Sequence, residues 1–273
     1  MYNDSEGNSI MVDEGVSHTV EGSKSLYDPV KRAEETAQIV SRGNQRRYYR
    51  FRPARFYGGI GTADCLGCCL RCLFCWSWDK VVRPDSYGTF YSPHQVAGNL
   101  TKIAYKKGFR QVRISGNEPT LARDHLLQVL GQIPSDILFI LETNGILIGH
   151  DATYARDLSR FENLYVRVSM KGTSEAEFTR LTGAKPAGFG LQIQALENMA
   201  RFNVTGHPAV MVSFSSPENI KALRPRLSEI KEDFKDFEVE ELVLYGKVEE
   251  RLMKAGLGYD TAHEPACIPP GQV

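Results

Sequence analysis

The chain has 273 residues, and its 33 lysines and arginines balance its 33 aspartates and glutamates. This length suits one large α/β domain with a sizeable buried core, and the formal net charge of zero gives no general attraction for nucleic acid or for an anionic membrane. No apolar run approaches the ~20 residues of a membrane-spanning helix, and the polar residues 1–22 do not resemble a signal peptide. We therefore expect a cytoplasmic protein that does not bind membranes.

Residues 1–44 are expected to form an N-terminal extension. The chain up to about Leu26 is polar with few apolar side chains, which predicts that this part is mobile. Asp28 followed by Pro29 is typical of a helix start, and this short helix is expected to end near Gly43.

Residues 45–56 predict an arginine-rich strand. Simple alternation gives it two different faces, with Tyr49 and Phe51 on one and Arg46, Arg50 and Arg52 on the other. Arginines interleaved with aromatic residues can bind nucleic acid. The alternative, which the neutral net charge favours, is an edge strand whose arginines are solvated.

Residues 64–76 hold five of the six cysteines in the chain. Cys68, Cys72 and Cys75 have the spacing C-x3-C-x2-C, and three thiolates this close on one loop can bind three irons of a [4Fe–4S] cluster and leave the fourth iron open. A structural zinc site usually needs two cysteine pairs about a dozen residues apart, and a ferredoxin-type cluster would use Cys65 as well. Cys65 and Cys69 are interpreted as bystanders, with a redox or substrate-linked thiol as the alternative for Cys65.

Strands and helices alternate after the cysteines. Strands are expected at residues 109–115, 137–141, 165–170, 209–214 and 242–245, and helices at 93–107, 121–132, 174–183, 191–202 and from 216 onward, with a kink or break at Pro225. The apolar strand 137–141 is expected to be covered on both faces, and Ser174 with Glu177 indicates a capping box.

This alternation implies a parallel sheet with too few strands for a closed eight-stranded barrel. A partial (β/α)6 barrel fits the count, with its core at residues 45–250. Residues 251–273 are expected to form a C-terminal tail that closes one end of the barrel as a loop.

The loop from Ser115 to Thr120, with the sequence Ser-Gly-Asn-Glu-Pro-Thr, follows a predicted strand and precedes a helix. It should therefore lie at the carboxyl rim, where barrel enzymes bind ligands. Its backbone carbonyls and the Glu118 carboxylate can accept hydrogen bonds from an ammonium group. Asn117 tolerates a left-handed backbone, although such a loop alone is also an ordinary turn.

Two further features point to the same rim. Glu142-Thr143-Asn144-Gly145 ends the apolar strand, where a polar turn is the alternative. In the strand 165–171, apolar residues alternate with the polar residues Tyr165, Arg167, Ser169 and Lys171. A polar inner face predicts a ligand cavity, and a solvated strand edge is the alternative.

The cysteine spacing, followed some forty residues later by the Gly-Asn-Glu-Pro loop, resembles the radical S-adenosylmethionine (radical SAM) superfamily over about residues 58–246. The resemblance implies a [4Fe–4S] cluster on Cys68, Cys72 and Cys75, with SAM at its open iron. It also implies that the reduced cluster cleaves SAM to methionine and a 5′-deoxyadenosyl radical, which abstracts hydrogen from a substrate, and that a flavodoxin or ferredoxin donates the electron.

The same resemblance implies a set of SAM-binding residues. Phe74 would lie near the adenine, the loop at the rim would bind the methionyl ammonium, and residues of the following strands would bind the carboxylate and ribose. Asn117 stands where the family usually has a second glycine. The residues assigned in this way are Phe74, Ser115, Gly116, Asn117, Glu118, Pro119, Asn144, Ser169 and Lys171.

Three functions stay open at this point. The short rim motifs, Thr-Asn-Gly among them, and the compact length resemble the activating enzymes of glycyl-radical enzymes such as pyruvate formate-lyase. The Phe-Cys-Trp end of the cysteine motif resembles the radical SAM enzymes of tRNA wybutosine synthesis, which the arginine-rich strand would suit. A non-enzymatic electron carrier would use four cysteines and no SAM. The neutral charge favours a protein or small-molecule substrate over RNA.

Overall fold

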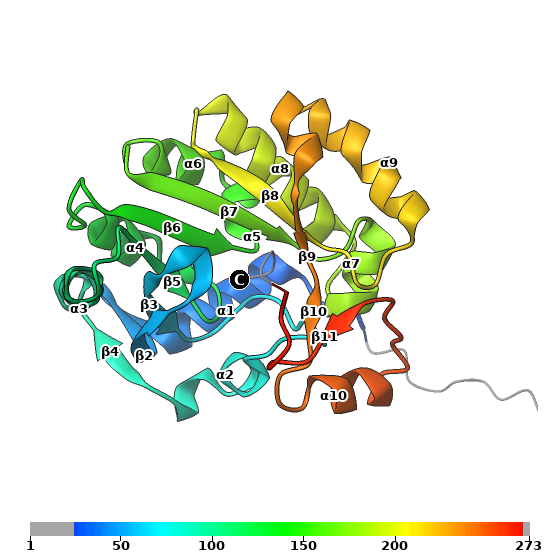
Figure 1. The fold of residues 1–273 in the computed structure, drawn as a ribbon, viewed down its shortest axis with the longest axis horizontal. Helices are drawn as coiled ribbons and strands as arrows, with labels where there is room; N and C mark the ends of the chain where they lie inside the picture. Colours follow the sequence, from blue (N-terminus) through cyan, green and yellow to red (C-terminus); the bar gives the residue numbers. More distant parts are fainter. Residues whose placement is uncertain (1–24, 270–273) are drawn as a thin grey trace, which may run out of the picture.

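Nine strands of the computed structural model, which describes residues 25–269, form one curved sheet (Figure 1). Their order is β1-β2-β3-β5-β6-β7-β8-β9, with β4 paired to β2, and neighbours from β3 to β9 run parallel. Because β1 and β9 stand at opposite ends of this order, the sheet is the predicted partial barrel rather than a closed one. The strands are β1 (Ser41–Arg42), β2 (Gln45–Ala54), β3 (Ile60–Cys65), β4 (Thr89–Tyr91), β5 (Gln111–Ser115), β6 (Leu138–Thr143), β7 (Leu164–Met170), β8 (Gly206–Met211) and β9 (Glu238–Glu240).

Helices cover the outside of this sheet, where α3, α4, α6, α8 and α9 lie in Figure 1. None of the helices within residues 25–269 is both long and apolar enough to cross a membrane. α9 continues past Pro225, so this proline does not divide it. The helices are α1 (Pro29–Val40), α2 (Trp78–Val82), α3 (Pro93–Lys107), α4 (Arg123–Leu130), α5 (Ile146–His150), α6 (Ala152–Leu158), α7 (Glu175–Thr182), α8 (Ala187–Arg201), α9 (Pro217–Ser228) and α10 (Val248–Lys254).

The packed core lies between the outer face of the strands and these helices. Phe139, Val166 and Val168 are fully buried there, while the alternate residues point to the concave side of the sheet. The predicted alternation of residues 165–171 is confirmed, because the polar residues of this strand line a cavity on the concave side.

The prediction that strand 137–141 is covered on both faces is wrong. Leu138 and Ile140 line the same concave cavity as the polar residues of β7, and Leu138 is 38% exposed. Only the outer face of β6 packs on helices. Continuous hydrophobicity therefore marks a strand that has one face in the core and one face on the cavity.

A β-bulge corrects the predicted faces of β2. The register with β3 shifts between Tyr48 and Arg50, and one extra residue moves the following side chains to the opposite face. Phe51 therefore stacks on Tyr48 with ring centroids 5.7 Å apart, while Arg50 and Arg52 line the concave cavity. Arg46 is 1% exposed and donates to two backbone carbonyl groups. The three arginines do not share a solvated face.

Helix α1 belongs to the main core of the molecule. Asp28 caps it, as predicted, by accepting hydrogen bonds from two backbone N–H groups of the first turn. Ala33 and Val40 are buried in the same cluster as the residues of the sheet. The predicted mobile segment lies largely in residues 1–24, outside the described residues.

The last parallel strand is β9, which the sequence did not predict. Residues 242–245, which were expected to form it, contribute β10 (Leu242–Val243) to a separate two-stranded sheet with β11 (Ala262–His263). That prediction is wrong because β9 has only three residues, two of them glutamates, and gives no apolar signal. The expected C-terminal tail accordingly contains the end of α10 and a strand, and is not simply a loop.

The predicted capping box at Ser174 is only half formed. Ser174 Oγ accepts from the N–H of Glu177 at 3.3 Å. The Glu177 carboxylate, however, accepts hydrogen bonds from Thr173, Ser215 and Asn219. Glu177 therefore joins the loops that precede α7 and α9, which lie at the carboxyl ends of β7 and β8.

His125 is a buried histidine whose protonation opposes folding. Its Nδ1 donates to the carbonyl of Asn44 at 2.7 Å, and its Nε2 accepts from the Tyr48 hydroxyl at 2.9 Å. Burial lowers the pKa of His125 to about 4. The stability contributed by the neutral ring is therefore present above the unfolded pKa of about 6.5 and is lost as the pH falls through 4.

We predict that His125→Gln removes this pH dependence. Between pH 7.5 and pH 5, the wild-type chain should lose about 2 kcal/mol of unfolding free energy that the variant does not lose. The reason is that His125 gains a proton on unfolding at pH 5, whereas a glutamine at this position does not titrate. Urea unfolding at the two pH values measures the difference. The exposed His94→Gln is the control and should follow the wild type. The same loss of unfolding free energy between the two pH values in the wild type and in His125→Gln would contradict the prediction.

Candidate functional site

A cavity of about 1030 Å³ occupies the concave side of the sheet. It is lined by the cysteine loop (residues 66–76), by the loops after β5 and β6, and by the inner faces of β5 to β9. Pro119 is the exception among the predicted site residues, because it is buried and does not line the cavity. The predicted residues that line the cavity are Cys68, Cys72, Phe74, Cys75, Ser115, Gly116, Asn117, Glu118, Asn144, Ser169 and Lys171.

The structure separates the five clustered cysteines into two groups. Cys68, Cys72 and Cys75 line the cavity, and the N–H of Cys75 donates to the carbonyl of Cys72 at 2.9 Å in a tight turn. Cys65 and Cys69 are fully buried and do not line it. The three cavity cysteines are the set with the C-x3-C-x2-C spacing.

The chemistry of these thiols fits a metal group that replaces their protons. Burial raises the pKa of Cys72, and it raises that of Cys75 to about 11. A hydrogen bond with the Cys69 thiol lowers the pKa of Cys68. Cys68 also acts electrostatically on Cys72 and Cys75 and raises both pKa values, so the three thiols lie near one another. Three thiols of one loop that line the same cavity match the donor set that the predicted cluster needs.

Asn117 joins the loop after β5 to the cysteine loop. Its Oδ1 accepts from the N–H of Gly67 at 2.7 Å, and its Nδ2 donates to the carbonyl of Gly116 at 2.9 Å. The left-handed residue of this loop is Gly116, with φ +96°, and not Asn117 as expected. A Cβ at Gly116 would lie 3.0 Å from the carbonyl oxygen of Cys65, so this glycine allows the loop after β5 to approach the end of β3.

Glu118 ties the ends of two strands together. Its carboxylate is 1% exposed and accepts hydrogen bonds from Thr120 N at 3.1 Å, Thr120 Oγ1 at 2.6 Å, Thr143 Oγ1 at 2.7 Å and Asn144 N at 2.8 Å. The backbone N–H of Glu118 donates to the carbonyl of Gly67 at 2.9 Å. We call Asn117, Glu118 and these partners the rim hub. A direct contact between Glu118 and a bound ammonium group stays a prediction.

Asn144 extends the rim hub to the thiols. Its Nδ2 lies 3.2 Å from Cys69 Sγ and 3.6 Å from Cys68 Sγ. Its carbonyl accepts from Gln192 of α8 at 2.7 Å, which fixes the loop from the outer side. The loop after β6 is therefore held between a helix and the cysteine loop.

Charged side chains alternate in sign across the floor of the cavity. Arg50 and Arg52 of β2 bind Asp64 of β3 at 2.6 and 2.9 Å. On the next strands, Arg113 binds Glu142 at 2.5 Å. Arg167 of β7 binds two carboxylates of β9 at 2.6 Å each. We call this set the ion-pair belt; it comprises Arg50, Arg52, Asp64, Arg113, Glu142, Arg167, Glu238 and Glu240.

The belt keeps Glu142, Glu238 and Glu240 ionised although they are partly buried. Burial works against the charged forms of Glu142 and Glu240, but the neighbouring arginines prevail and hold both pKa values below their ordinary range. Burial also opposes ionisation of Glu238, and hydrogen bonds from His207 and Arg167 lower its pKa to about 2. The cavity floor is therefore a set of fixed and mutually neutralised charges at neutral pH.

Ser169 and Lys171 connect the belt to the cysteine loop. Ser169 Oγ donates to Glu240 at 2.7 Å, and Lys171 Nζ hydrogen-bonds Ser169 Oγ and lies 3.9 Å from Glu240. Lys171 Nζ also lies 5.9 Å from the centroid of the Phe74 ring. The predicted pair thus lies between the belt and the predicted adenine residue.

The sequence did not predict several members of the belt. Glu238 and Glu240 lie on β9, whose only signal is a Glu-Val-Glu alternation that is too short to identify a strand. Arg113 and Asp64 are single charges within apolar strands, and such charges could have indicated a polar cavity. Which of these charges form pairs depends on the order of the strands within the sheet, and the sequence does not give that order directly.

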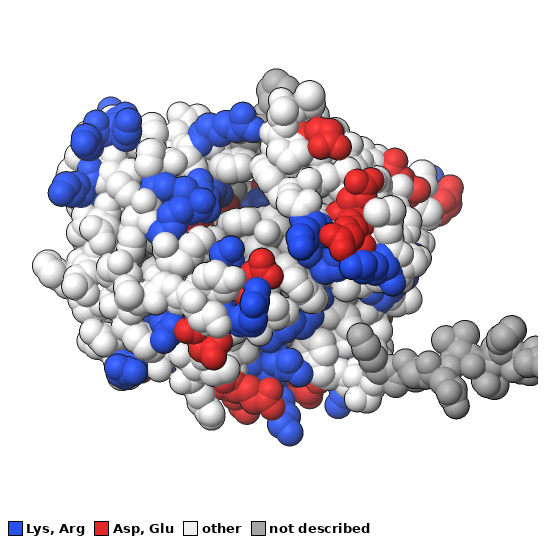
Figure 2. Space-filling model, turned by 90° about the horizontal axis from the view of Figure 1, so that it is seen from below, with Lys and Arg blue, Asp and Glu red and all other residues white. Residues whose placement is uncertain are grey.

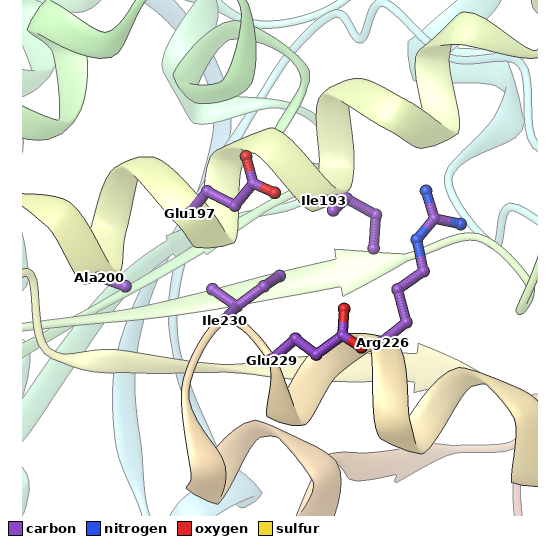
Figure 3. A pocket seen from close by; sticks show the side chains of 6 residues that line it. All are labelled: Ile193, Glu197, Ala200, Arg226, Glu229 and Ile230. Atoms are coloured by element: carbon purple, nitrogen blue, oxygen red, sulfur yellow. The ribbon is translucent and has the colours of Figure 1, made fainter.

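A second, smaller cavity of about 360 Å³ lies between α8 and α9 (Figure 3). Ile193 and Ala200 of α8 and Ile230, just after α9, form its apolar part, and Arg226 of α9 binds Glu175 at 3.0 Å. It contains no cysteine and none of the predicted site residues. The concave cavity is therefore the candidate site.

We predict that Glu118→Gln destabilises the chain by about 3 kcal/mol. A glutamine has one acceptor oxygen for the four donors around Glu118, and its amide group would face donors that need an acceptor. Urea unfolding of the protein without metal measures the loss. The exposed Glu197→Gln on α8 is the matched control and should cost little. If both variants unfold like the wild type, the rim hub does not stabilise the fold.

A model of the radical SAM superfamily matches residues 65–223. Among curated proteins, a probable GTP 3′,8-cyclase from Methanococcus vannielii is 29% identical over 118 residues, 42% of this chain and 37% of that protein. A probable GTP 3′,8-cyclase from Sulfurisphaera tokodaii is likewise 29% identical over 118 residues, 42% of this chain and 35% of that protein. The match thus spans little more than a third of these relatives.

Among solved structures, SuiB from Streptococcus suis, crystallised with S-adenosylmethionine, is similar with a TM-score of 0.52. Its identity is 19%, and the alignment covers 65% of this chain and 39% of that chain. At this identity, the likeness shows a shared fold. The family match covers more than half of the 273 residues and includes the cysteine loop and the rim hub. The chain therefore belongs to the radical SAM superfamily, a family of enzymes whose cofactors are a [4Fe–4S] cluster and SAM.

Proposed function

We propose that Cys68, Cys72 and Cys75 hold the cluster and that the rim residues hold SAM, so that a hydrogen atom is abstracted from a substrate in the concave cavity. One observation carries this proposal. The three cysteines with the family spacing line the same cavity as nearly all the residues assigned to SAM, whereas Cys65 and Cys69 do not. When bound, the reduced cluster supplies the electron that divides SAM into methionine and the hydrogen-abstracting 5′-deoxyadenosyl radical.

The chain's own residues position these groups. The rim hub sets the distance between the cysteine loop and the backbone carbonyls that would accept from the methionyl ammonium. Lys171 can bind the SAM carboxylate, because it lies in the cavity and shares Glu240 with Arg167. Phe74 packs on Phe214 with centroids 5.5 Å apart, and this apolar pair suits the adenine ring.

We predict that the protein, purified without oxygen, binds about four irons and four sulfides per chain and forms 5′-deoxyadenosine from SAM when reduced with dithionite. Cys68→Ala, Cys72→Ala and Cys75→Ala should each lose the cluster and this activity. Cys69→Ala and Cys267→Ala should keep both, because neither thiol lines the cavity. Iron and sulfide analysis with product chromatography measures these effects. Retention of a full cluster in Cys72→Ala would refute the assignment.

The second part of the proposal concerns the class of substrate that the cavity binds. The Thr-Asn-Gly rim motif favours a glycyl-radical enzyme as protein substrate, and the names of the curated relatives favour GTP. The ion-pair belt bears on this choice. Each lysine and arginine that lines the cavity within residues 25–269 lies against a carboxylate, so a polyphosphate would have to break existing ion pairs. We therefore favour a neutral or zwitterionic substrate group, as a protein or a small molecule supplies.

RNA is less favoured for a related reason. The arginine strand does not form an exposed platform, because Arg46 is buried and Arg50 and Arg52 bind Asp64. On the face drawn in Figure 2, basic and acidic side chains are interspersed rather than gathered into a continuous basic surface. An RNA-binding surface needs several cations that are available to phosphates.

We predict that GTP neither binds tightly nor stimulates formation of 5′-deoxyadenosine. Asp64→Asn should bind GTP more tightly than the wild type, because it releases Arg50 and Arg52 from their carboxylate. Equilibrium dialysis with GTP at two salt concentrations measures the affinities, with the surface variant Asp233→Asn as control. Transfer of deuterium from labelled GTP into 5′-deoxyadenosine by the wild-type enzyme would contradict the prediction.

A further inference from the structure

Helix α10 contacts the cysteine loop although it lies outside the matched family segment, residues 65–223. Arg251 Nε donates to the carbonyl of Leu73 at 2.6 Å, and Arg251 Nη2 donates to the carbonyl of Cys75 at 2.6 Å. The guanidinium carbon also lies 4.7 Å from the centroid of the Trp78 ring in α2. One side chain thus binds the backbone on both sides of Phe74.

The position of Arg251 is fixed by apolar packing. Val248 and Leu252 of α10 are buried in a small cluster with Met211 and Phe214, and Leu73 and Phe74 of the cysteine loop pack against this cluster. The helix therefore touches the loop through its apolar face as well as through the guanidinium. The backbone N–H of Leu73 is held from the other side by the carbonyl of Leu181 at 2.9 Å.

We propose that Arg251 is a positioning residue for the cluster, an inference that rests on the proposed role of Cys75 as a ligand. Its two hydrogen bonds hold the turn that presents the third thiolate. Its positive charge beside this turn stabilises the reduced cluster, which carries one more negative charge than the oxidised one. Its stacking on Trp78 covers the loop on the side of α2 and limits access of water and oxygen.

These roles depend on different properties of the guanidinium. The planar fork of arginine can donate to two carbonyls at once, whereas lysine keeps the charge on a single ammonium group without this geometry. Arg251→Lys therefore keeps the charge but loses the paired hydrogen bonds to the carbonyls of Leu73 and Cys75. Arg251→Gln removes the charge and most of this hydrogen bonding. Lys254→Gln is the matched control, because Lys254 lies on the same helix, is exposed and binds Glu250.

The experiment uses the full chain with its reconstituted cluster. Measurements are iron and sulfide content, the midpoint potential followed by the electron paramagnetic resonance signal of the reduced cluster, and the rate of bleaching in air. We expect Arg251→Gln to have a lower midpoint potential than the wild type and Arg251→Lys to keep nearly the wild-type value. Both variants should lose the cluster in air about tenfold faster, because groups that hold metal ligands in place typically contribute about tenfold or more to metal affinity. Lys254→Gln should match the wild type throughout.

The outcomes separate this inference from the proposed function. Wild-type potential and bleaching in both Arg251 variants would overturn the role of Arg251 while leaving the cluster assignment intact. A wild-type chain that binds no cluster would overturn the proposed function and this inference with it. If Arg251→Gln does not fold, as judged by circular dichroism of the metal-free protein, Arg251→Lys carries the test through its bleaching rate.

Discussion

The buried carboxylate of Glu118 is the constraint on which the geometry of the site depends. It gathers donors from the loops after β5 and β6, while the backbone of the same residue and the side chain of Asn117 bind Gly67. A buried carboxylate without such partners would cost several kcal/mol. The loops therefore have one arrangement in which this charge is satisfied, and in that arrangement the cysteine loop lies beside the rim of the sheet.

The ion-pair belt explains why the concave side of the sheet is not filled. Apolar side chains pointing inward would collapse on one another and close the space. Fixed arginine–carboxylate pairs link adjacent strands, and β7 to β9 across β8, and they face the cavity. Buried ion pairs give little net stability when compared with apolar packing, so the belt is better understood as a device that keeps a polar cavity open.

Much of this architecture follows from local sequence patterns. The helix cap at Asp28 and the alternation in β7 depend on neighbouring residues, and the structure confirms both. The cysteine spacing is an equally local pattern, and the three cysteines that it selects line one cavity. The errors arise where long-range contacts decide. The bulge in β2 is set by its pairing with β3, and β9 exists because β8 offers it an edge. Arg251 reaches the cysteine loop across more than 170 residues of chain, a contact that no local pattern could indicate.

The pairing of Arg167 with β9 has a consequence for how the chain reaches its native state. Its two carboxylate partners lie 71 and 73 residues later in the sequence. While the chain emerges from the ribosome, β7 is complete well before β9 has been made, and Arg167 then lacks both of the carboxylates that bind it directly. Stable docking of β7 and β8 should therefore wait for β9, so that the second half of the barrel consolidates late and as one cooperative unit.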